Sequence, residues 1–196
     1  MGELSLRLVG AILIYFATAV RFYYEKRTKV RAVESVRHLR IARGAATLSS
    51  WTWFALLIFL PIPGFVPVNG LPFARAAVVP LQIVGLVILA TSVALFYWCH
   101  RALGEFWFGE PGLKAGHELI RVGPYRWIRH PMYTSFFTGY VGALLLLQSW
   151  PFLIPILFAP GFYVMSRVEE EILEQRFPDA YARYRAEAGR FLPKLS

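Results

Sequence analysis

The sequence predicts an all-α integral membrane protein with about five transmembrane helices. Apolar residues make up 57% of the 196 residues and charged residues 17%, whereas soluble domains average about 45–50% and about 25%. The apolar residues are concentrated in long runs without Asp, Glu, Lys or Arg, and most basic residues lie between these runs. The length suits a single membrane domain that covers residues 1–196.

The uncharged runs give the positions of the predicted spans. A membrane helix needs about 20 apolar residues, and the runs 44–74 and 76–100 each hold one. The run 130–166 is long enough for two short helices, with a polar, proline-containing break at Gln148-Ser149-Trp150-Pro151. Together with the apolar stretch near the N-terminus, the predicted spans are 4–24, 47–67, 77–99, 131–148 and 150–166.

The apolar stretch near the N-terminus has two interpretations. As a span, it carries Arg7 and Arg21 near its ends, where long side chains can reach the membrane surface. As a signal peptide, it would use Ala17-Thr18-Ala19 as the cleavage site. Cleavage would leave a strongly basic segment outside the cell, against the usual charge bias. The span is therefore the preferred interpretation.

The distribution of basic residues predicts the orientation. Eight Lys and Arg residues lie in 21–43, five in 101–129 and six in 167–194. With the N-terminus outside, nineteen of the 21 lie in the cytoplasm, together with the C-terminus. The net charge of +9 is then explained by basic loops that interact with anionic lipid head groups. Nucleic-acid binding fits less well, because the cations flank hydrophobic spans.

The segments between the spans have distinct patterns. Apolar residues three apart in 21–43 favour a helix lying near the membrane surface, with a solvated linker as the alternative. Glycine and proline residues between 100 and 130 predict a loop with several bends.

A charged helix is predicted after Ser166. It contains Glu169-Glu170-Glu171, and Glu170 lies three residues before Leu173, so the two side chains share a face. Pro178 suits the first turn of a second helix, whose inner face would carry Tyr181 and Tyr184.

The most informative stretch is 123–133, Gly-Pro-Tyr-Arg-Trp-Ile-Arg-His-Pro-Met-Tyr. Pro131 suits the first position of a helix, with His130 just before it. Free backbone N–H groups there, together with Arg129, would favour an anionic group such as a carboxylate. Tyr125 and Tyr133 offer flat faces for a ring. The alternative is that the arginines and tyrosines only anchor the chain at the membrane surface.

This stretch resembles the R-H-P-x-Y signature of the isoprenylcysteine carboxyl methyltransferase and phospholipid methyltransferase family. The similarity covers residues 103–193, almost half of the chain. One departure is Pro178, where the family usually has glycine; it alters the junction between two helices and removes no polar group. The further motifs that resemble the family are His117-Glu118-Leu119-Ile120, Glu169-Glu170, Phe177, Tyr181, Tyr184 and Arg190-Phe191-Leu192-Pro193.

The resemblance implies S-adenosylmethionine as the cofactor, held by the regions 103–133 and 167–193 on the cytoplasmic side. The sequence has no glycine-rich nucleotide fingerprint after a strand, which agrees with this. The alternative for Glu169–Glu171 is a solvated helix start. No histidines or carboxylates have the spacing of metal ligands, so no metal is predicted. The implied cofactor-binding residues are His117, Leu119, Gly123, Tyr125, Arg129, His130, Tyr133, Glu169 and Glu170.

The implied reaction is methyl transfer to a lipid-like acceptor, foremost the carboxylate of an isoprenylcysteine-type substrate. Positioning supplies much of the rate of such an in-line displacement. A carboxylate arrives ionised and needs a cationic clamp, for which Arg190 or Arg167 is suited. The implied catalytic residues are thus Arg190, Glu170 and Arg167, although Arg190 also suits packing at a helix end. An amine acceptor would instead need a base, such as His130 or a glutamate.

Two other classes of function remain open from the sequence. Membrane reductases of the sterol type are similar in the C-terminal half and use NAD(P)H, but they usually carry more spans. A non-enzymatic scaffold or small transporter would be favoured by charged residues inside the spans, and none lies away from the span ends. The partners expected from the sequence are the lipid bilayer and a lipidic or prenylated small molecule, and no nucleic acid.

Overall fold

A computed structural model gives the fold. It describes residues 3–27, 34–35, 70–107, 112–113 and 116–194, together with five single residues between 44 and 62. The predicted span 47–67 lies outside the described residues, apart from Leu48, Ala55, Ile58 and Ile62. The part of the chain that the structure describes is mostly helical, which confirms the predicted fold class.

Six α-helices and three short 3-10 helices make up the described structure. The α-helices are α1 (Glu3–Arg27), α3 (Arg75–Leu103), α4 (Pro131–Leu147), α5 (Leu153–Leu157), α6 (Pro160–Arg176) and α7 (Pro178–Glu187). The 3-10 helices are η1 (Gly104–Phe106), η2 (Gly123–Arg126) and η3 (Trp150–Phe152). The two-residue strands β1 (Glu34–Ser35) and β2 (Gly112–Leu113) pair in antiparallel.

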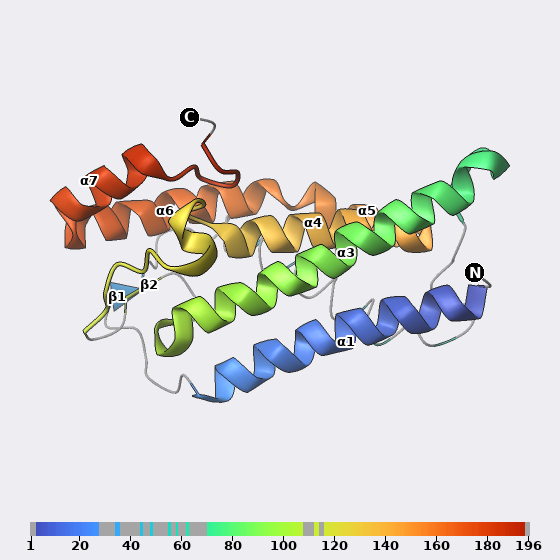
Figure 1. Ribbon diagram of the computed structural model, residues 1–196, viewed down its shortest axis with the longest axis horizontal. Helices are drawn as coiled ribbons and strands as arrows, with labels where there is room; N and C mark the ends of the chain where they lie inside the picture. The colour runs from blue at the N-terminus through green and yellow to red at the C-terminus, as the bar shows by residue number, and fades with distance from the viewer. Residues whose placement is uncertain are drawn as a thin grey trace.

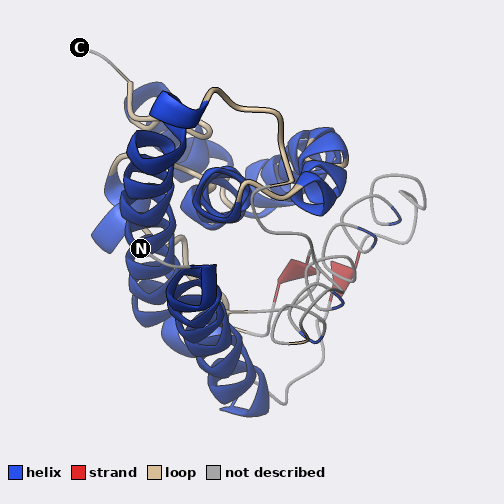
Figure 2. Cartoon of the chain, turned by 90° about the vertical axis from the view of Figure 1, so that its right-hand side faces the viewer, coloured by secondary structure: helices blue, strands red, loops and turns tan. Residues whose placement is uncertain are grey.

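The long helices form an elongated bundle (Figure 1). α1 and α3 begin at the same end of the molecule and run toward the other end, α4 returns, and α5 and α6 again follow the direction of α1. Figure 2, seen from the end where α1 begins, shows these helices packed around one another. α7 folds back beside the last turns of α6, and we call this end of the bundle the α7 end.

The contact between α3 and α4 is the most extensive in the described structure. Two glycines allow the helix backbones to touch. A Cβ atom on Gly85 would lie 2.3 Å from the backbone nitrogen of Leu146, and one on Gly142 would lie 2.6 Å from that of Leu89. Small residues permit such close approach between membrane helices. The main apolar core lies at this contact and includes Leu89, Leu146 and Phe152.

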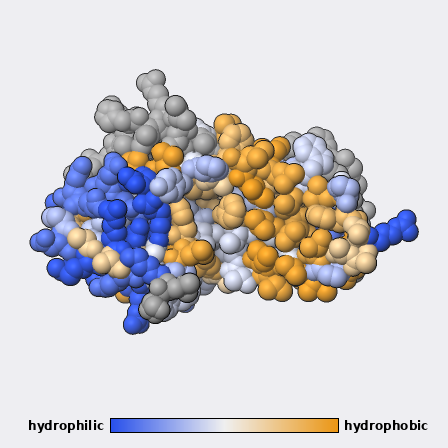
Figure 3. Space-filling view, turned by 90° about the horizontal axis from the view of Figure 1, so that it is seen from above, coloured by the Kyte–Doolittle hydropathy of each residue, from blue (hydrophilic) through white to orange (hydrophobic). Residues whose placement is uncertain are grey.

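The outer surface of the bundle is apolar. Three helical stretches among the described residues are long and apolar enough to cross a bilayer: Leu8–Lys26, Arg75–Phe106 and Trp150–Arg176. Figure 3 shows hydrophobic residues over the middle of the molecule and hydrophilic residues gathered at the α7 end. Soluble monomers rarely expose continuous apolar surface on this scale. The protein is therefore an all-α integral membrane protein.

The structure differs from the sequence prediction between 150 and 176. The region predicted as one span followed by a separate charged helix is instead split into η3, α5 and α6. The break lies at Phe158 and Ala159, directly before Pro160, because proline fits the first turn of a helix better than its interior. α6 continues through Ser166 to Arg176, so the end of the predicted span and the predicted charged helix belong to one continuous helix.

The structure also differs within the segment 21–43. α1 continues to Arg27, and Glu34–Ser35 is a strand where a surface helix was predicted. This strand pairs with Gly112–Leu113 from the loop before α4, a partner that local spacing does not reveal. The other residues of 21–43 lie outside the described ranges.

Candidate active site

Three segments that are distant in sequence meet at the α7 end. They are the loop with η2 that leads into α4, the last turns of α6, and the tail that follows α7 (Figure 1). Pro131 occupies the first turn of α4 and Pro178 that of α7, as predicted, so these prolines fix where both helices begin.

Glu170 is the centre of this region. Its side chain is 4% exposed, and its Oε1 accepts hydrogen bonds from Arg129 Nε at 3.0 Å and Arg190 Nε at 3.1 Å. Arg190 Nη2 donates to Oε2 at 2.7 Å, and His130 Nε2 lies 3.2 Å from Oε1. The predicted inward orientation of Glu170 is confirmed. A buried carboxylate is stable here because two guanidinium groups and an imidazole surround it.

Glu169 lies on the more open side of the same cluster. The Tyr133 hydroxyl donates to Glu169 Oε1 at 2.5 Å, and His130 Nδ1 lies 3.2 Å from Glu169 Oε2. The side chain of Glu169 keeps 27% of its surface exposed, compared with 4% for Glu170. The two neighbouring glutamates therefore differ in accessibility: Glu170 is enclosed, and Glu169 can also contact a bound molecule.

His130 is held between the two carboxylates. Each of its ring nitrogens lies 3.2 Å from a glutamate oxygen, so the doubly protonated ring satisfies both contacts. Burial alone would lower the pKa of His130, but the hydrogen bonds and charges of Glu169 and Glu170 outweigh burial and raise it above 6.5. The geometry thus favours the imidazolium form.

This arrangement predicts a pH-dependent stability. The pKa of His130 is raised above 6.5 in the folded chain, so the folded state binds this proton more tightly than the unfolded state. The stabilisation is complete below about pH 6.5 and is lost as the pH rises through the raised pKa. Thermal unfolding between about pH 6 and pH 8 should show a steeper loss of stability in the wild type than in His130→Gln. Equal slopes would contradict the assigned imidazolium.

The tail after α7 is bound to the segment before α4 by backbone hydrogen bonds. Arg129 N donates to Gly189 O at 2.8 Å, His130 N to Arg190 O at 2.9 Å, and Gly189 N to Trp127 O at 3.0 Å. Only glycine fits at 189, because a Cβ atom there would lie 1.8 Å from Leu192 O. This pairing places Arg190 beside Glu170.

Two side chains reinforce the same junction. Arg129 contacts Glu170 through Nε, and its Nη1 donates to Ala188 O at the end of α7. The Tyr184 hydroxyl donates to Tyr125 O at 2.6 Å. Arg129 was expected beside an anionic group such as a carboxylate, and its guanidinium contacts the Glu170 carboxylate and the end of α7. Its structural role is to join α6, α7 and the loop.

Aromatic rings form one wall of the site. The Tyr133 ring lies nearly parallel to the His130 ring, with centroids 5.8 Å apart, and stacks on Phe162 at 5.1 Å. Tyr125 is buried, and burial raises its pKa well above 10, with Cys99 and Glu169 nearby. The structure therefore brings together Tyr125, Arg129, His130, Tyr133, Glu169, Glu170 and Arg190 from the residues expected in the site.

The remaining expected cofactor residues lie in the loop. The ring of His117 is 5.2 Å from that of Phe106, and Leu119 packs against the buried cluster of Tyr181, Tyr184 and Ala188. Gly123 has φ +59°, and a Cβ atom there would lie 3.0 Å from Trp98 Nε1. Leu119 and Gly123 thus shape the loop.

Sequence reasoning missed two contributors. Tyr163 lies under Arg190, whose guanidinium carbon is 4.9 Å from the ring centroid, and Thr134 Oγ1 donates to Phe191 O at 2.7 Å. For Tyr163 there was a signal: it precedes Arg167 by four residues and Glu170 by seven, a helical spacing. The sequence gave no signal for Thr134, because its partner is the backbone carbonyl of the distant residue Phe191.

Comparisons with known proteins place this region in a family. The protein-S-isoprenylcysteine O-methyltransferase of Saccharomyces cerevisiae is 34% identical over 82 residues, covering 41% of this chain and 34% of the yeast protein. The nickel-cobalt-cadmium resistance protein NccN of Alcaligenes xylosoxydans xylosoxydans is 35% identical over 83 residues, covering 40% of this chain and 38% of NccN. The protein YpbQ of Bacillus subtilis is 31% identical over 91 residues, covering 45% of this chain and 54% of YpbQ.

The matched regions amount to between about a third and about half of the length of these relatives. The sequence model of the phospholipid methyltransferase family matches residues 81–180, just over half of the 196 residues. The match includes most of α3, the whole of α4, α5 and α6, and the Glu169–Glu170 pair. The chain belongs to the phospholipid methyltransferase family.

Proposed function

We propose that the protein transfers a methyl group from S-adenosylmethionine to a lipid-like acceptor, at the α7 end of its membrane bundle. The observation that carries the proposal is the cluster of Glu169, Glu170, His130, Arg129 and Arg190. It lies where the loop before α4 meets the chain after α6. Four of its five residues, all except Arg190, lie within the region matched by the family.

The residues of the site fit the proposed donor. When bound, the donor supplies a methyl group on a positively charged sulfur. Glu169 has an accessible carboxylate for a cation or a ribose hydroxyl, and the Tyr133 face suits a cation or a ring. Tyr181 contributes a buried hydroxyl that has no hydrogen-bond partner among the described residues. His117, Leu119 and Gly123 are proposed to hold the loop over the donor.

The protonated form of His130 and the contacts of the glutamates support a carboxylate as the acceptor. As an imidazolium, His130 cannot take up a proton from an amine. Glu170 is occupied by Arg129, Arg190 and His130, and Glu169 is engaged by the Tyr133 hydroxyl and His130, so both glutamates are less suited as a base. An acceptor carboxylate is ionised near neutral pH and needs no base. An isoprenylcysteine-type carboxylate therefore fits better than an amine head group.

Arg190 and Arg167 have different proposed roles. Arg190 uses Nε and Nη2 to hold both oxygens of Glu170, so Glu170 is proposed as a positioning residue for Arg190. Arg167 is exposed on α6 and lies near the Tyr163 hydroxyl. It is the better clamp for the acceptor carboxylate. Arg190 and Arg167 would together hold the acceptor oxygen in line with the methyl group, and such positioning gives much of the rate.

The charge distribution supports an orientation in the membrane. We propose that the α7 end faces the cytoplasm, because the segments 101–129 and 167–194 carry eleven of the 21 basic residues. With this orientation the N-terminus lies outside, and the acceptor reaches the site from the inner leaflet.

The test is donor binding by the purified protein in lipid or mild detergent. Calorimetry should show binding of S-adenosylmethionine at micromolar concentration, corresponding to about −8 kcal/mol, and no binding of NADPH. Incubation with labelled donor and either a prenylcysteine analogue or phosphatidylethanolamine, followed by mass spectrometry, should give a labelled ester only with the former. Absence of donor binding, or NADPH binding in its place, would overturn the proposal.

A further inference from the structure

The surface of α6 beside the candidate active site carries Tyr163 and Arg167. They lie seven and three residues before Glu170, so the three side chains follow one face of the helix, with Tyr163 about 10 Å farther from the α7 end. Tyr163 keeps 49% of its surface exposed, and Arg167 is also exposed, whereas Glu170 is buried. This face therefore leads from an enclosed carboxylate to two side chains that an outside molecule can reach.

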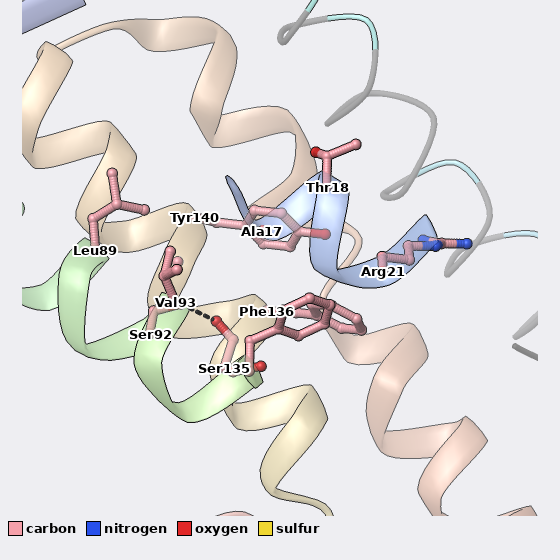
Figure 4. Close-up of a pocket in the computed structure, with 11 residues that line it drawn as sticks. Ala17, Thr18, Arg21, Leu89, Ser92, Val93, Ser135, Phe136 and Tyr140 are labelled. Carbon is pink, nitrogen blue, oxygen red and sulfur yellow. Dashed lines mark hydrogen bonds between the residues drawn. The ribbon is translucent and has the colours of Figure 1, made fainter. Parts of the chain in front are cut away.

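The neighbouring residues Phe162 and Tyr163 lie on different sides of α6. Phe162 is buried, and its ring stacks on Tyr133 and lies 5.7 Å from Phe136. Phe136 lines a cavity of about 60 Å³ between α1, α3 and α4 (Figure 4). Tyr163 is not among the residues that line this cavity. Phe162 thus faces the interior of the bundle, and Tyr163 faces outward.

Tyr163 is joined to the ion cluster by the tail after α7. The Arg190 guanidinium carbon lies 4.9 Å from the Tyr163 ring centroid, while Nε and Nη2 of the same side chain bind Glu170. The next residue, Phe191, has its ring 6.4 Å from that of Tyr163 and 6.1 Å from that of His130. Tyr163 therefore belongs to the same assembly of side chains as Glu170 and His130.

The hydroxyl of Tyr163 leaves one position for a ligand. It interacts with the side chains of both Arg190 and Arg167. A guanidinium group has only N–H donors, so the hydroxyl oxygen is the acceptor in both interactions. The O–H proton of Tyr163 remains, and it donates to no group among the described residues. The group that fits this O–H is a hydrogen-bond acceptor with a negative charge, because two arginines lie beside it.

Arg167 differs from Arg190 in its charge balance. Arg190 is paired with both oxygens of Glu170, whereas no carboxylate in the described part of the chain forms an ion pair with Arg167. The Tyr163 hydroxyl holds the Arg167 guanidinium without neutralising it. Tyr163 and Arg167 together present one O–H donor and one cation, and this combination binds a carboxylate through charge-assisted hydrogen bonds.

We propose that Tyr163 distinguishes the methyl acceptor from the methylated product: its O–H, together with Arg167, binds the acceptor carboxylate and releases the ester. This inference rests on the proposed function. Methylation converts the carboxylate into a neutral ester, which can no longer form an ion pair with Arg167 and accepts a weaker hydrogen bond from Tyr163. An amine head group carries a positive charge, so Arg167 repels it. Tyr163 is thus a specificity-determining residue of the acceptor site.

A binding experiment tests the assignment without depending on catalysis. The probes are a prenylcysteine analogue with a free carboxylate and its methyl ester, each titrated into the full-length protein in nanodiscs. The wild type should bind the carboxylate more tightly than the ester. Tyr163→Phe keeps the ring beside Arg190 and removes the O–H, so it should weaken carboxylate binding about tenfold and ester binding less. Equal binding of both probes by the wild type, or an unchanged preference in Tyr163→Phe, would overturn the proposal.

The matched control is Tyr97→Phe, which removes the hydroxyl of another exposed tyrosine, on α3. This variant should keep the preference of the wild type, whereas Arg167→Gln should remove it. In the methyl transfer assay, Tyr163→Phe should raise KM for the acceptor about tenfold, with donor binding equal to that of the wild type.

The outcomes for the wild type separate this inference from the proposed function. If the wild type binds no donor but still prefers the carboxylate to its ester, the proposed function fails while the carboxylate site stands. If the wild type binds the donor but shows no such preference, the proposed function stands and the role of Tyr163 is wrong.

Discussion

Glu170→Ala is expected to abolish donor binding and to lower the free energy of unfolding by about 3–5 kcal/mol, the usual cost of removing one partner from a buried ion pair. The side chain is enclosed, and Arg129, Arg190 and His130 all contact it. Without the carboxylate, these cations repel one another in a region with little water. The tail that carries Arg190 should then separate from the loop before α4.

The matched control for this experiment is Glu171→Ala, one residue further along α6 and exposed. It removes the same charge from the same helix and should leave both stability and donor binding within error of the wild type. Thermal unfolding in detergent and calorimetric titration measure the two effects. If Glu170→Ala behaved like Glu171→Ala, the cluster around Glu170 would not organise the site. Glu170→Gln tests the charge of this side chain separately from its shape. The amide keeps the volume of the carboxylate but loses the ion pairs with Arg129 and Arg190.

Gly189→Ala is expected to displace the tail from the loop and to lower donor affinity by at least tenfold, or about 1.4 kcal/mol. The new Cβ would lie 1.8 Å from Leu192 O, a backbone atom that cannot move away by rotating a side chain. Relief requires the backbone to shift, which breaks the hydrogen bonds from Arg129 N to Gly189 O and from His130 N to Arg190 O. Arg190 then loses its place beside Glu170.

Hydrogen exchange is the direct measurement for this variant. The backbone amides of Arg129 and His130 should exchange faster in Gly189→Ala, while amides in α3 keep their protection. Gly10→Ala is the matched control, since its Cβ would meet Leu147 side-chain carbons at an ordinary 3.5 Å. Unchanged exchange at Arg129 and His130 would show that the tail is not held by this pairing.

Much of the fold followed from local patterns in the sequence. The ends of α1, α3 and α4 lie within four residues of the ends of three predicted spans, and Pro131 and Pro178 begin helices as expected. Hydrophobic runs and prolines act on the chain nearby, so their effects can be predicted from sequence. The continuation of α6 past Ser166 was missed because a change from apolar to charged residues does not end a helix.

The candidate site was predicted only in part. Helical spacing correctly indicated that Glu170 faces inward with Leu173. The same spacing did not show that Arg129 and Arg190 both pair with Glu170, across 41 and 20 residues. The sequence predicted an anionic group such as a carboxylate beside Arg129, but only the structure shows that its guanidinium contacts Glu170 and Ala188 O.

The sequence alone determined that this is a helical membrane protein, because apolar runs and basic flanks reflect each segment's own preference for lipid or water. It also determined the start of α4 and which glutamate turns inward, since both depend on neighbours within one or two helical turns. Only the tertiary structure decided which cations surround Glu170, that the tail pairs with the loop at Gly189, and that α1, α3 and α4 enclose a cavity. These contacts join segments distant in sequence, so they exist only when the helices are packed together.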